Sequence, residues 1–177
     1  QVVSLYQGHF PADEALLKKL PGIGDYTAGA VASIAFDLPV PAVDGNVLRV
    51  LTRVLSCDED ITLPKTKETF RQLLLEVEPS PGAGDFNQSL MELGAMVCLP
   101  NGAPKCGECP LSSLCRAHTL GVEETLPVKA KKKPRKLEQR TVFLLTCGEK
   151  LALRRRPEKG LLAGLWELPS VEGPLTE

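Results

Sequence analysis

The 177-residue sequence has no apolar run long enough to span a bilayer, and its first residues do not resemble a secretory signal peptide. It contains no internal repeat. Its net charge is only −1, which argues against a protein coated in positive charge. Hydrophobic residues make up 43% of the chain, as expected for a globular protein with a buried core. The length allows one medium domain, or one domain and part of a second.

Both ends of the sequence look cut. The chain opens on Gln1 and stops at Glu177, shortly after a strand-like segment. We therefore expect a fragment of a longer protein.

Four of the six cysteines crowd into one short segment. They are Cys98, Cys106, Cys109 and Cys115, with seven, two and five residues between them. This clustering indicates ligands of one metal centre, an iron–sulfur cluster or a structural zinc, better than a disulfide scaffold. It also favours a reducing compartment. Cys57 and Cys147 lie outside the cluster, and we expect each to be a small buried apolar residue.

The periodicity of apolar residues divides the chain into three parts. Residues 1–122 are predicted to be mostly helical, with helices at Val2–Leu5, after Pro11, over 25–36, after Asp44, after Pro64 and over about 85–97. On the helix after Pro64, the spacing places Phe70, Leu73, Leu74 and Val77 on one face. Residues 123–140 are rich in Pro, Lys and Arg and fit a solvated linker better than a phosphate contact. Residues 141–177 change to strand-like patterning.

The turn Leu20-Pro21-Gly22-Ile23-Gly24 joins two predicted helices. Gly22 and Gly24 allow backbone angles at which several amides point outward together, at the positive end of the following helix. Such a turn can hold a DNA phosphate without reading sequence. The alternative is a tight helix–helix turn that only packs.

Residues 20–31, Leu-Pro-Gly-Ile-Gly-Asp-Tyr-Thr-Ala-Gly-Ala-Val, resemble the helix–hairpin–helix DNA glycosylases. Bifunctional members place a Schiff-base lysine two residues after the second turn glycine, where this chain has Tyr26. The resemblance therefore implies a monofunctional glycosylase, although Tyr26 could also be a core aromatic residue. It also implies a catalytic role for Asp44, which would stabilise the positive charge that develops on the sugar. Asp44 is equally suited to cap the helix that follows it.

The segments Val43–Val47, Phe86–Gln88 and Glu92–Ala95 are similar to the adenine-specific branch of these glycosylases. That resemblance implies that Asn46 helps to bind the sugar–phosphate and that Gln88 reaches the base pocket. Gln88 could instead complete a capping box with Asp85 as the N-cap residue. The implied substrate is double-stranded DNA in which adenine is mispaired with 8-oxoguanine or guanine, and the flipped adenine enters a pocket.

The cluster-bearing glycosylases space their ligands as Cys-x6-Cys-x2-Cys-x5-Cys. This chain differs by one extra residue in the first interval, which a loop absorbs easily. The resemblance implies a [4Fe–4S] cluster on the four cysteines, with zinc as the alternative.

Residues 141–177, and Gly160–Pro169 above all, look like the start of the Nudix-like domain that recognises 8-oxoguanine in this family. The Nudix hydrolase motif is absent, so we expect no pyrophosphatase activity, and we expect Trp166 to be a core residue.

The glutamate that serves as the family's general acid has no matching motif here, so we expect the chain alone to be inactive. We expect a monomer that acts in the bacterial cytoplasm, or in the nucleus or mitochondrion of a eukaryote. A bifunctional lyase of the endonuclease III type and a non-catalytic DNA-binding iron–sulfur module remain alternatives.

Overall fold

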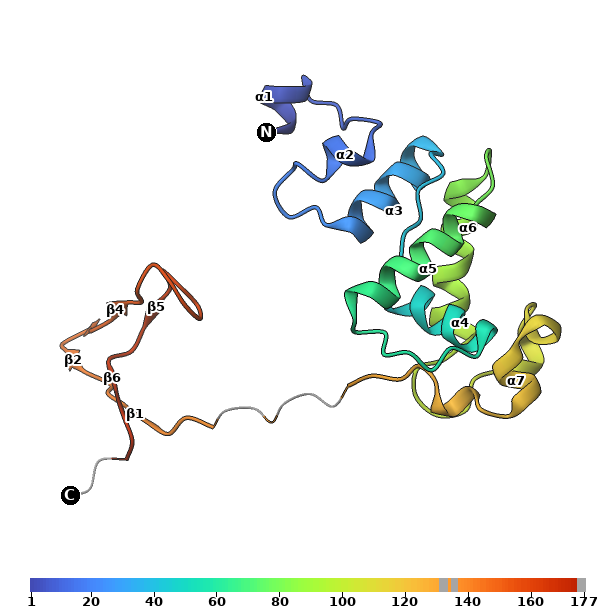
Figure 1. Cartoon of the computed structure of the whole chain (residues 1–177). Coiled ribbons are helices and arrows are strands. Elements are labelled where there is room, and N and C mark those ends of the chain that lie inside the picture. Colours follow the sequence, from blue (N-terminus) through green and yellow to red (C-terminus); the bar gives the residue numbers. More distant parts are fainter. Residues whose placement is uncertain (131–133, 135–136, 175–177) are drawn as a thin grey trace. The chain divides into compact units, whose positions relative to one another are not determined.

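The computed structural model describes residues 1–130, 134 and 137–174. Contacts divide the chain into two units, Gln1–Lys131 and Lys132–Glu177, which are described separately (Figure 1). The described part of the first unit is helical. Its α-helices are α1 (Val2–Tyr6), α2 (Glu14–Leu17), α3 (Asp25–Phe36), α4 (Gly45–Leu55), α5 (Pro64–Val77), α6 (Ala83–Glu92) and α7 (Arg116–Leu120). A short π-helix, η1 (Leu93–Val97), precedes the cysteine segment. Two 3-10 helices, η2 (Cys106–Glu108) and η3 (Ser112–Leu114), lie within it, and a third, η4 (Glu123–Thr125), follows it.

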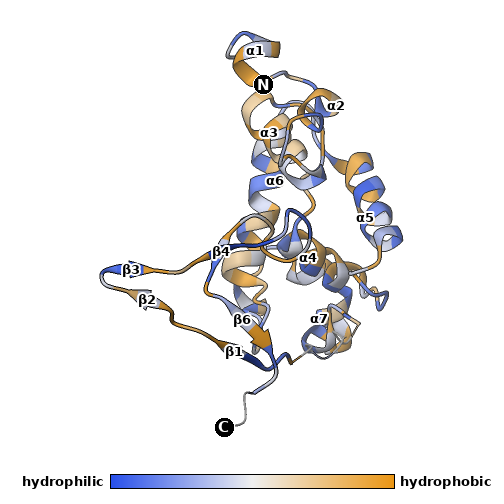
Figure 2. Ribbon diagram, turned by 90° about the vertical axis from the view of Figure 1, so that its left-hand side faces the viewer, coloured by the Kyte–Doolittle hydropathy of each residue, from blue (hydrophilic) through white to orange (hydrophobic). Residues whose placement is uncertain are grey.

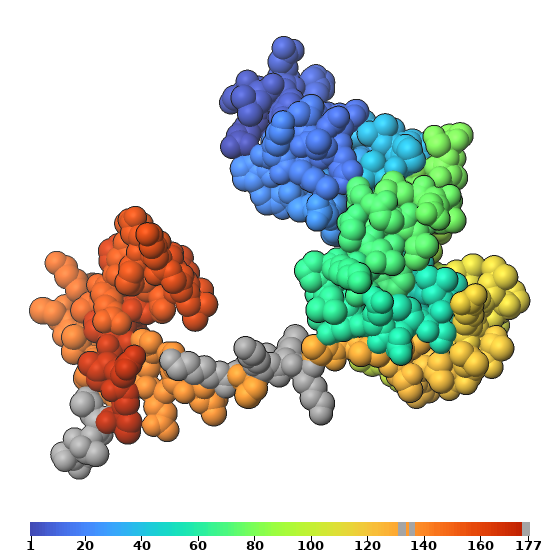
Figure 3. Space-filling model, in the orientation of Figure 1, coloured from blue at the N-terminus to red at the C-terminus, as the bar shows by residue number. Residues whose placement is uncertain are grey.

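Helix α4 lies in the centre of the first unit, with apolar residues on two sides. Val47 and Val50 pack with Leu74 of α5 and Leu90 of α6. Leu48 packs with Ile61 and with Phe70 of α5 in a second cluster. The space-filling view shows the first unit as one continuous body, from the N-terminal helices to the cysteine segment (Figure 3).

The predicted apolar face of α5 is only partly correct. Phe70 and Leu74 are buried, but Leu73 and Val77 are exposed to 39% and 64%. Hydrophobic and hydrophilic residues alternate around this helix in Figure 2. The buried stripe of α5 is therefore narrower than its sequence predicts, because α4 covers only one side of it.

Helices α3 and α6 approach each other through small residues. The buried positions of α3 are Ala28, Gly29, Ala32 and Ser33, whereas its largest aliphatic residue, Ile34, is exposed. A Cβ atom at Gly84 of α6 would lie 2.9 Å from the Ser33 carbonyl oxygen, and one at Gly29 would lie 2.3 Å from the Pro41 carbonyl oxygen. Glycine is therefore required at both positions for the backbones to pack this closely.

The capping box that was the alternative role for Gln88 does not form. The helix begins at Ala83, so Asp85 lies inside its first turn instead of at the N-cap. The cap comes from Asp37, at the end of α3, whose carboxylate accepts hydrogen bonds from the amides of Gly82 and Gly84. These two amides hold the pKa of Asp37 below its usual range.

The second unit consists of three antiparallel strand pairs: β1 (Arg140–Val142) with β6 (Ser170–Glu172), β2 (Thr146–Cys147) with β3 (Lys150–Leu151), and β4 (Arg154–Arg155) with β5 (Trp166–Glu167). Among the described residues of this unit, none is fully buried. Trp166 is 67% exposed and Cys147 is exposed, so both were wrongly predicted to be buried. Cys57 is only half-buried, and it packs against the core cluster that contains Leu48 and Phe70.

None of the helices in the described part of the chain combines the length and apolar character that crossing a membrane requires.

The close packing at Gly29 predicts a large effect of one methyl group. Gly29→Ala forces a Cβ atom against the backbone at Pro41, and we expect it to destabilise the fold by at least about 2 kcal/mol. Gly45→Ala is the matched control, since a Cβ atom there meets no heavy atom within 4 Å. We expect this control to stabilise the fold by up to about 1 kcal/mol. Urea unfolding of both variants measures the difference, and equal midpoints would contradict the packing argument.

Candidate functional site

The hairpin between α2 and α3 exposes its backbone. Gly22 has a φ of +83°, and Gly24 is the N-cap residue of α3 with no side chain to satisfy the first amides. A Cβ atom built at either glycine meets no heavy atom within 4 Å, so the backbone faces open space. An anion can approach these amides at the positive end of α3.

Asp44 caps α4 through one carboxylate oxygen and binds the Asn46 side chain through the other. Its Oδ1 accepts from the amides of Asn46 and Val47, each at 2.8 Å, and its Oδ2 accepts from Asn46 Nδ2 at 2.9 Å. Asp44 is half-buried, and three hydrogen bonds fix its orientation. The structure thus brings the two predicted residues Asp44 and Asn46 into direct contact.

Tyr26 and Gln88 are linked to this region through α6. Tyr26 Oη donates to Met91 Sδ at 3.5 Å, and Met91 packs against the core that contains Val47. Gln88 is exposed and lies one helical turn before Met91, so both project from the same side of α6. Tyr26 is 43% exposed, which argues against a purely core role.

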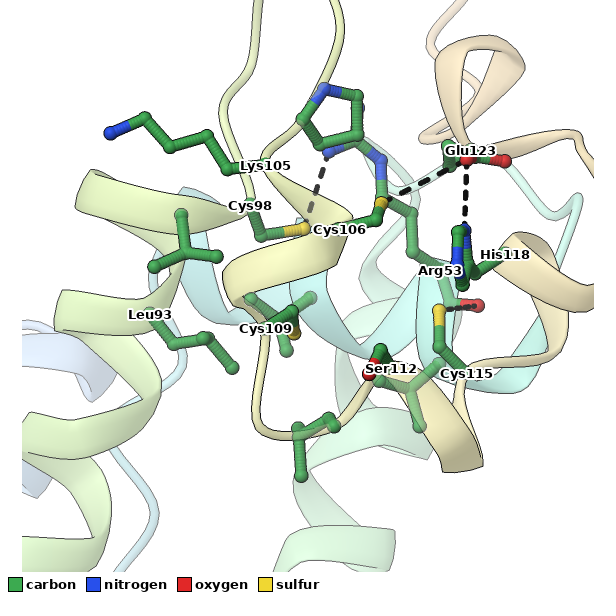
Figure 4. Close-up of a pocket in the computed structure, with 15 residues that line it drawn as sticks. Arg53, Leu93, Cys98, Lys105, Cys106, Cys109, Ser112, Cys115, His118 and Glu123 are labelled. Carbon is green, nitrogen blue, oxygen red and sulfur yellow. Dashed lines mark hydrogen bonds and ion pairs between the residues drawn. The ribbon is translucent and has the colours of Figure 1, made fainter.

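The four clustered cysteines line one pocket. Cys98, Cys106, Cys109 and Cys115 surround a common space, and Lys105 extends away from it (Figure 4). All four are free thiols. Burial raises the pKa of Cys106, and the adjacent Glu123 carboxylate and the other three thiols act in the same direction.

This donor set fits a metal centre. Four soft sulfur ligands with like-charge repulsion between their ionised forms need a cation to stabilise them. Arg53 supplies part of that charge, since its Nη1 donates to Cys98 Sγ at 3.2 Å. His118 and Glu123 lie on the rim, where a sulfur of Cys106, a ring nitrogen of His118 and an oxygen of Glu123 are all within 4.8 Å of one another. Because cysteine, histidine and glutamate are all zinc ligands, zinc is an alternative occupant of this site.

Two arginines of α4, which the sequence analysis missed, connect Asp44's helix to the cysteine segment. Arg49 donates to Asn46 Oδ1 at 2.9 Å, to the Gly94 carbonyl oxygen at 2.6 Å and to the Cys98 carbonyl oxygen at 2.7 Å. Arg53 also donates to the carbonyl oxygens of Leu99 and Leu126. Both guanidiniums are almost fully buried. The signal for them was available, because two cations four residues apart interrupt an otherwise apolar helix.

Comparisons with known proteins match the hairpin to a known motif and most of the chain to known relatives. A helix–hairpin–helix motif model matches residues 5–34. Over 176 aligned residues, the chain is 45% identical to the adenine DNA glycosylase of Arabidopsis thaliana, with 92% of this chain and 28% of that protein covered. It is 37% identical to the Homo sapiens adenine DNA glycosylase, with 97% and 40% covered. The chain spans less than half the length of these curated relatives.

Two solved structures share the fold. A thermostable thymine-DNA glycosylase has a TM-score of 0.59 and 31% identity, covering 67% of this chain and 54% of the other. A non-covalent endonuclease III–DNA complex has a TM-score of 0.55 and 31% identity, covering 68% and 54%. The first unit therefore has a mainly helical helix–hairpin–helix glycosylase fold.

A buried amide supports the segment that leads to Asp44. Asn87 is fully buried; its Oδ1 accepts from the Ala42 amide at 2.8 Å, and its Nδ2 donates to the Val40 carbonyl oxygen and to Glu78 Oε1. The other oxygen of Glu78 is buried and accepts no hydrogen bond within the described part of the chain. Burial raises the pKa of Glu78 to about 7, against the opposing effects of Asn87 and Arg71.

The raised pKa of Glu78 predicts a pH-dependent stability. The folded state binds its proton more tightly than the unfolded state, so this contribution is complete below about pH 4.5 and is lost as the pH rises through about 7. We expect Glu78→Gln to flatten the dependence of the unfolding free energy on pH between these values. Glu76→Gln, at an exposed neighbour, should retain the original profile. Parallel urea titrations from pH 4.5 to 8 test this, and identical slopes for all three proteins would refute it.

Proposed function

Because this chain is a relative of the adenine DNA glycosylases, we propose that it supplies the helical core of an enzyme that hydrolyses the N-glycosidic bond of adenine in double-stranded DNA. We propose mispairs with 8-oxoguanine or guanine as the substrate. The observation that carries the proposal is the fixed carboxylate of Asp44, in a unit whose hairpin exposes the amides of a phosphate site.

Asp44 is the electrostatic stabiliser in this proposal. As the bond between the sugar and adenine breaks, positive charge develops on the sugar, and adenine leaves with the electron pair and accepts a proton. A carboxylate whose position is already set by hydrogen bonds stabilises that charge without reorganising. Water then adds to the sugar carbon and loses a proton. In this proposal Asn46, which is held by Asp44 and Arg49, contacts the sugar–phosphate.

The other predicted residues take supporting positions. Gly22 and Gly24 present the amides that hold a backbone phosphate, which positions the DNA without reading its sequence. Tyr26 of α3, whose hydroxyl donates to Met91 Sδ of α6, and Gln88 of α6 are the residues that would line the base pocket. Since a phenol cannot form an imine, Tyr26 favours simple hydrolysis over the lyase chemistry of endonuclease III. Borohydride trapping on abasic DNA distinguishes these two reactions.

We propose that Cys98, Cys106, Cys109 and Cys115 hold a [4Fe–4S] cluster. When bound, the cluster cross-links four points of the segment and contributes its binding energy to folding. Arg53 of the chain contacts two of the four thiols: its guanidinium donates to Cys98 Sγ, and its carbonyl oxygen accepts from Cys115 Sγ.

The domain assignment completes the proposal. Residues 1–122 form the glycosylase unit with its metal loop, residues 123–140 form a basic linker, and residues 141–177 begin a Nudix-like domain that recognises 8-oxoguanine. Of the basic residues in this linker, Lys131, Lys132, Lys133, Arg135 and Lys136 lie outside the described residues.

The metal assignment predicts a composition. Anaerobically purified chain should contain about four iron atoms and about four acid-labile sulfides, as a cubane with four cysteine ligands does. Cys109→Ser should lose most of this iron, whereas the matched change at the exposed Cys147 should keep it. One zinc per chain, with neither iron nor sulfide, would assign the site to zinc.

The catalytic role of Asp44 predicts a separation of chemistry from binding. The test protein is a chimera in which this chain replaces the matching segment of the Arabidopsis relative, so that the parts outside the aligned region are present. Asp44→Asn should slow adenine release at least about 10³-fold while leaving duplex affinity nearly unchanged. The matched control is Asp13→Asn, because Asp13 also caps a helix, α2, by accepting from the Leu16 amide.

Retained turnover in Asp44→Asn would remove Asp44 from the mechanism. Equal losses in the Asp13 and Asp44 variants would reduce Asp44 to a helix cap. The 177-residue chain by itself is expected not to release adenine, since no glutamate in it matches the family's general acid.

A further inference from the structure

A negatively charged side chain lies next to the exposed amides of the hairpin. Asp25 is the first residue of α3, directly after Gly24, and its side chain is 81% exposed. A carboxylate here stabilises α3 through the helix dipole. The same carboxylate opposes the approach of a phosphate to the neighbouring amides, because like charges repel.

Lys18 neutralises this carboxylate from the other side of the hairpin. Its Nζ lies 2.8 Å from Asp25 Oδ1 and 2.7 Å from Glu14 Oε1. The Lys18 ammonium holds the pKa of Asp25 below its usual range, and Asp25 and Glu14 raise the pKa of Lys18. Lys18 is thus shared between two carboxylates, one on each side of the turn.

Glu14 is in turn held by a distant helix. Arg71 of α5 places its Nη2 3.0 Å and 2.9 Å from the two oxygens of Glu14. Along the row Arg71, Glu14, Lys18 and Asp25, the charges alternate in sign and sum to zero. We call these four residues the charge row.

We propose that Asp25 lowers the affinity of the hairpin for DNA phosphate and that Lys18, positioned by Glu14 and Arg71, screens Asp25 and thereby sets that affinity. This inference rests on the proposed DNA-binding role of the hairpin. Lys18 acts in it on Asp25 rather than as a direct phosphate ligand. The charge row is therefore a positioning and tuning device for binding, not a part of the glycosidic chemistry.

A double-mutant cycle tests the proposal with the 177-residue chain and a fluorescein-labelled undamaged duplex, by anisotropy at about 50 mM salt. Asp25→Asn should tighten binding about fivefold, because a repulsive charge is removed. Lys18→Met should weaken binding about tenfold in the wild-type background and less than about twofold in the Asp25→Asn background. Both effects should shrink at about 300 mM salt, where exposed charges are screened.

Lys19→Met is the matched control, since Lys19 is an exposed neighbour of the same charge. It should weaken binding equally in both backgrounds. Thermal unfolding distinguishes this effect from a folding defect. Asp25→Asn should slightly lower the melting temperature while it tightens DNA binding, whereas a folding defect would lower both the melting temperature and the duplex affinity.

Two results overturn the inference. Equal costs of Lys18→Met in both backgrounds would make Lys18 a direct phosphate ligand, and unchanged or weaker binding by Asp25→Asn would remove the repulsion. A different result would show that the hairpin does not bind DNA phosphate. In that case Gly22→Val, which strains a φ of +83°, would leave duplex affinity unaltered in a folded protein. If Gly22→Val abolishes binding while Asp25→Asn has no effect, only the charge row is refuted.

Discussion

The buried guanidiniums of two arginines join helix α4 to the cysteine segment of the first unit. Arg49 and Arg53 project from α4 and donate to carbonyl oxygens before, within and after the cysteine segment. A buried cation that lost these acceptors would be left unsatisfied at a cost of several kcal/mol. The hydrogen bonds of Arg49 and Arg53 therefore fix the position of α4, which has Asp44 at its N-terminus, relative to the segment that carries the thiols.

This arrangement is compatible with both the helix-capping role of Asp44 and the catalytic role that we propose for it. Its Oδ1 satisfies backbone amides of α4, which is what any N-cap aspartate does. Its Oδ2 accepts from the Asn46 side chain, whose own oxygen accepts from Arg49. The carboxylate is thus oriented by a helix end on one oxygen and by a side-chain relay on the other.

Much of the helical unit was predictable, and particular residues show why the rest was not. The starts of α3 and α4 follow from Gly24, Asp25 and Asp44, because helix starts are encoded locally. The start of α6 was wrong, since its cap is Asp37, a residue 45 positions away from Gly82. Exposure of Leu73 and Trp166 likewise depends on which elements lie nearby, and no local pattern reports that.

The candidate site divides in the same way. The four cysteines and Asp44 could be predicted from their spacing and residue type. The contacts of Asn87 and the raised pKa of Glu78 could not, because both arise from burial in the folded structure.

The base of the loop between the first two cysteines is closed by the backbone. The Lys105 amide donates to the Val97 carbonyl oxygen at 3.0 Å, and Arg53 donates to the Leu99 carbonyl oxygen. Both ends of the loop are therefore held by hydrogen bonds. The residues between them, Pro100 to Ala103, are exposed. We therefore expect extra length at this tip, such as the additional residue of this chain, to leave the sulfur positions unchanged. The tip is consequently a permissive place to graft a fluorescent reporter or an affinity tag beside the four clustered cysteines.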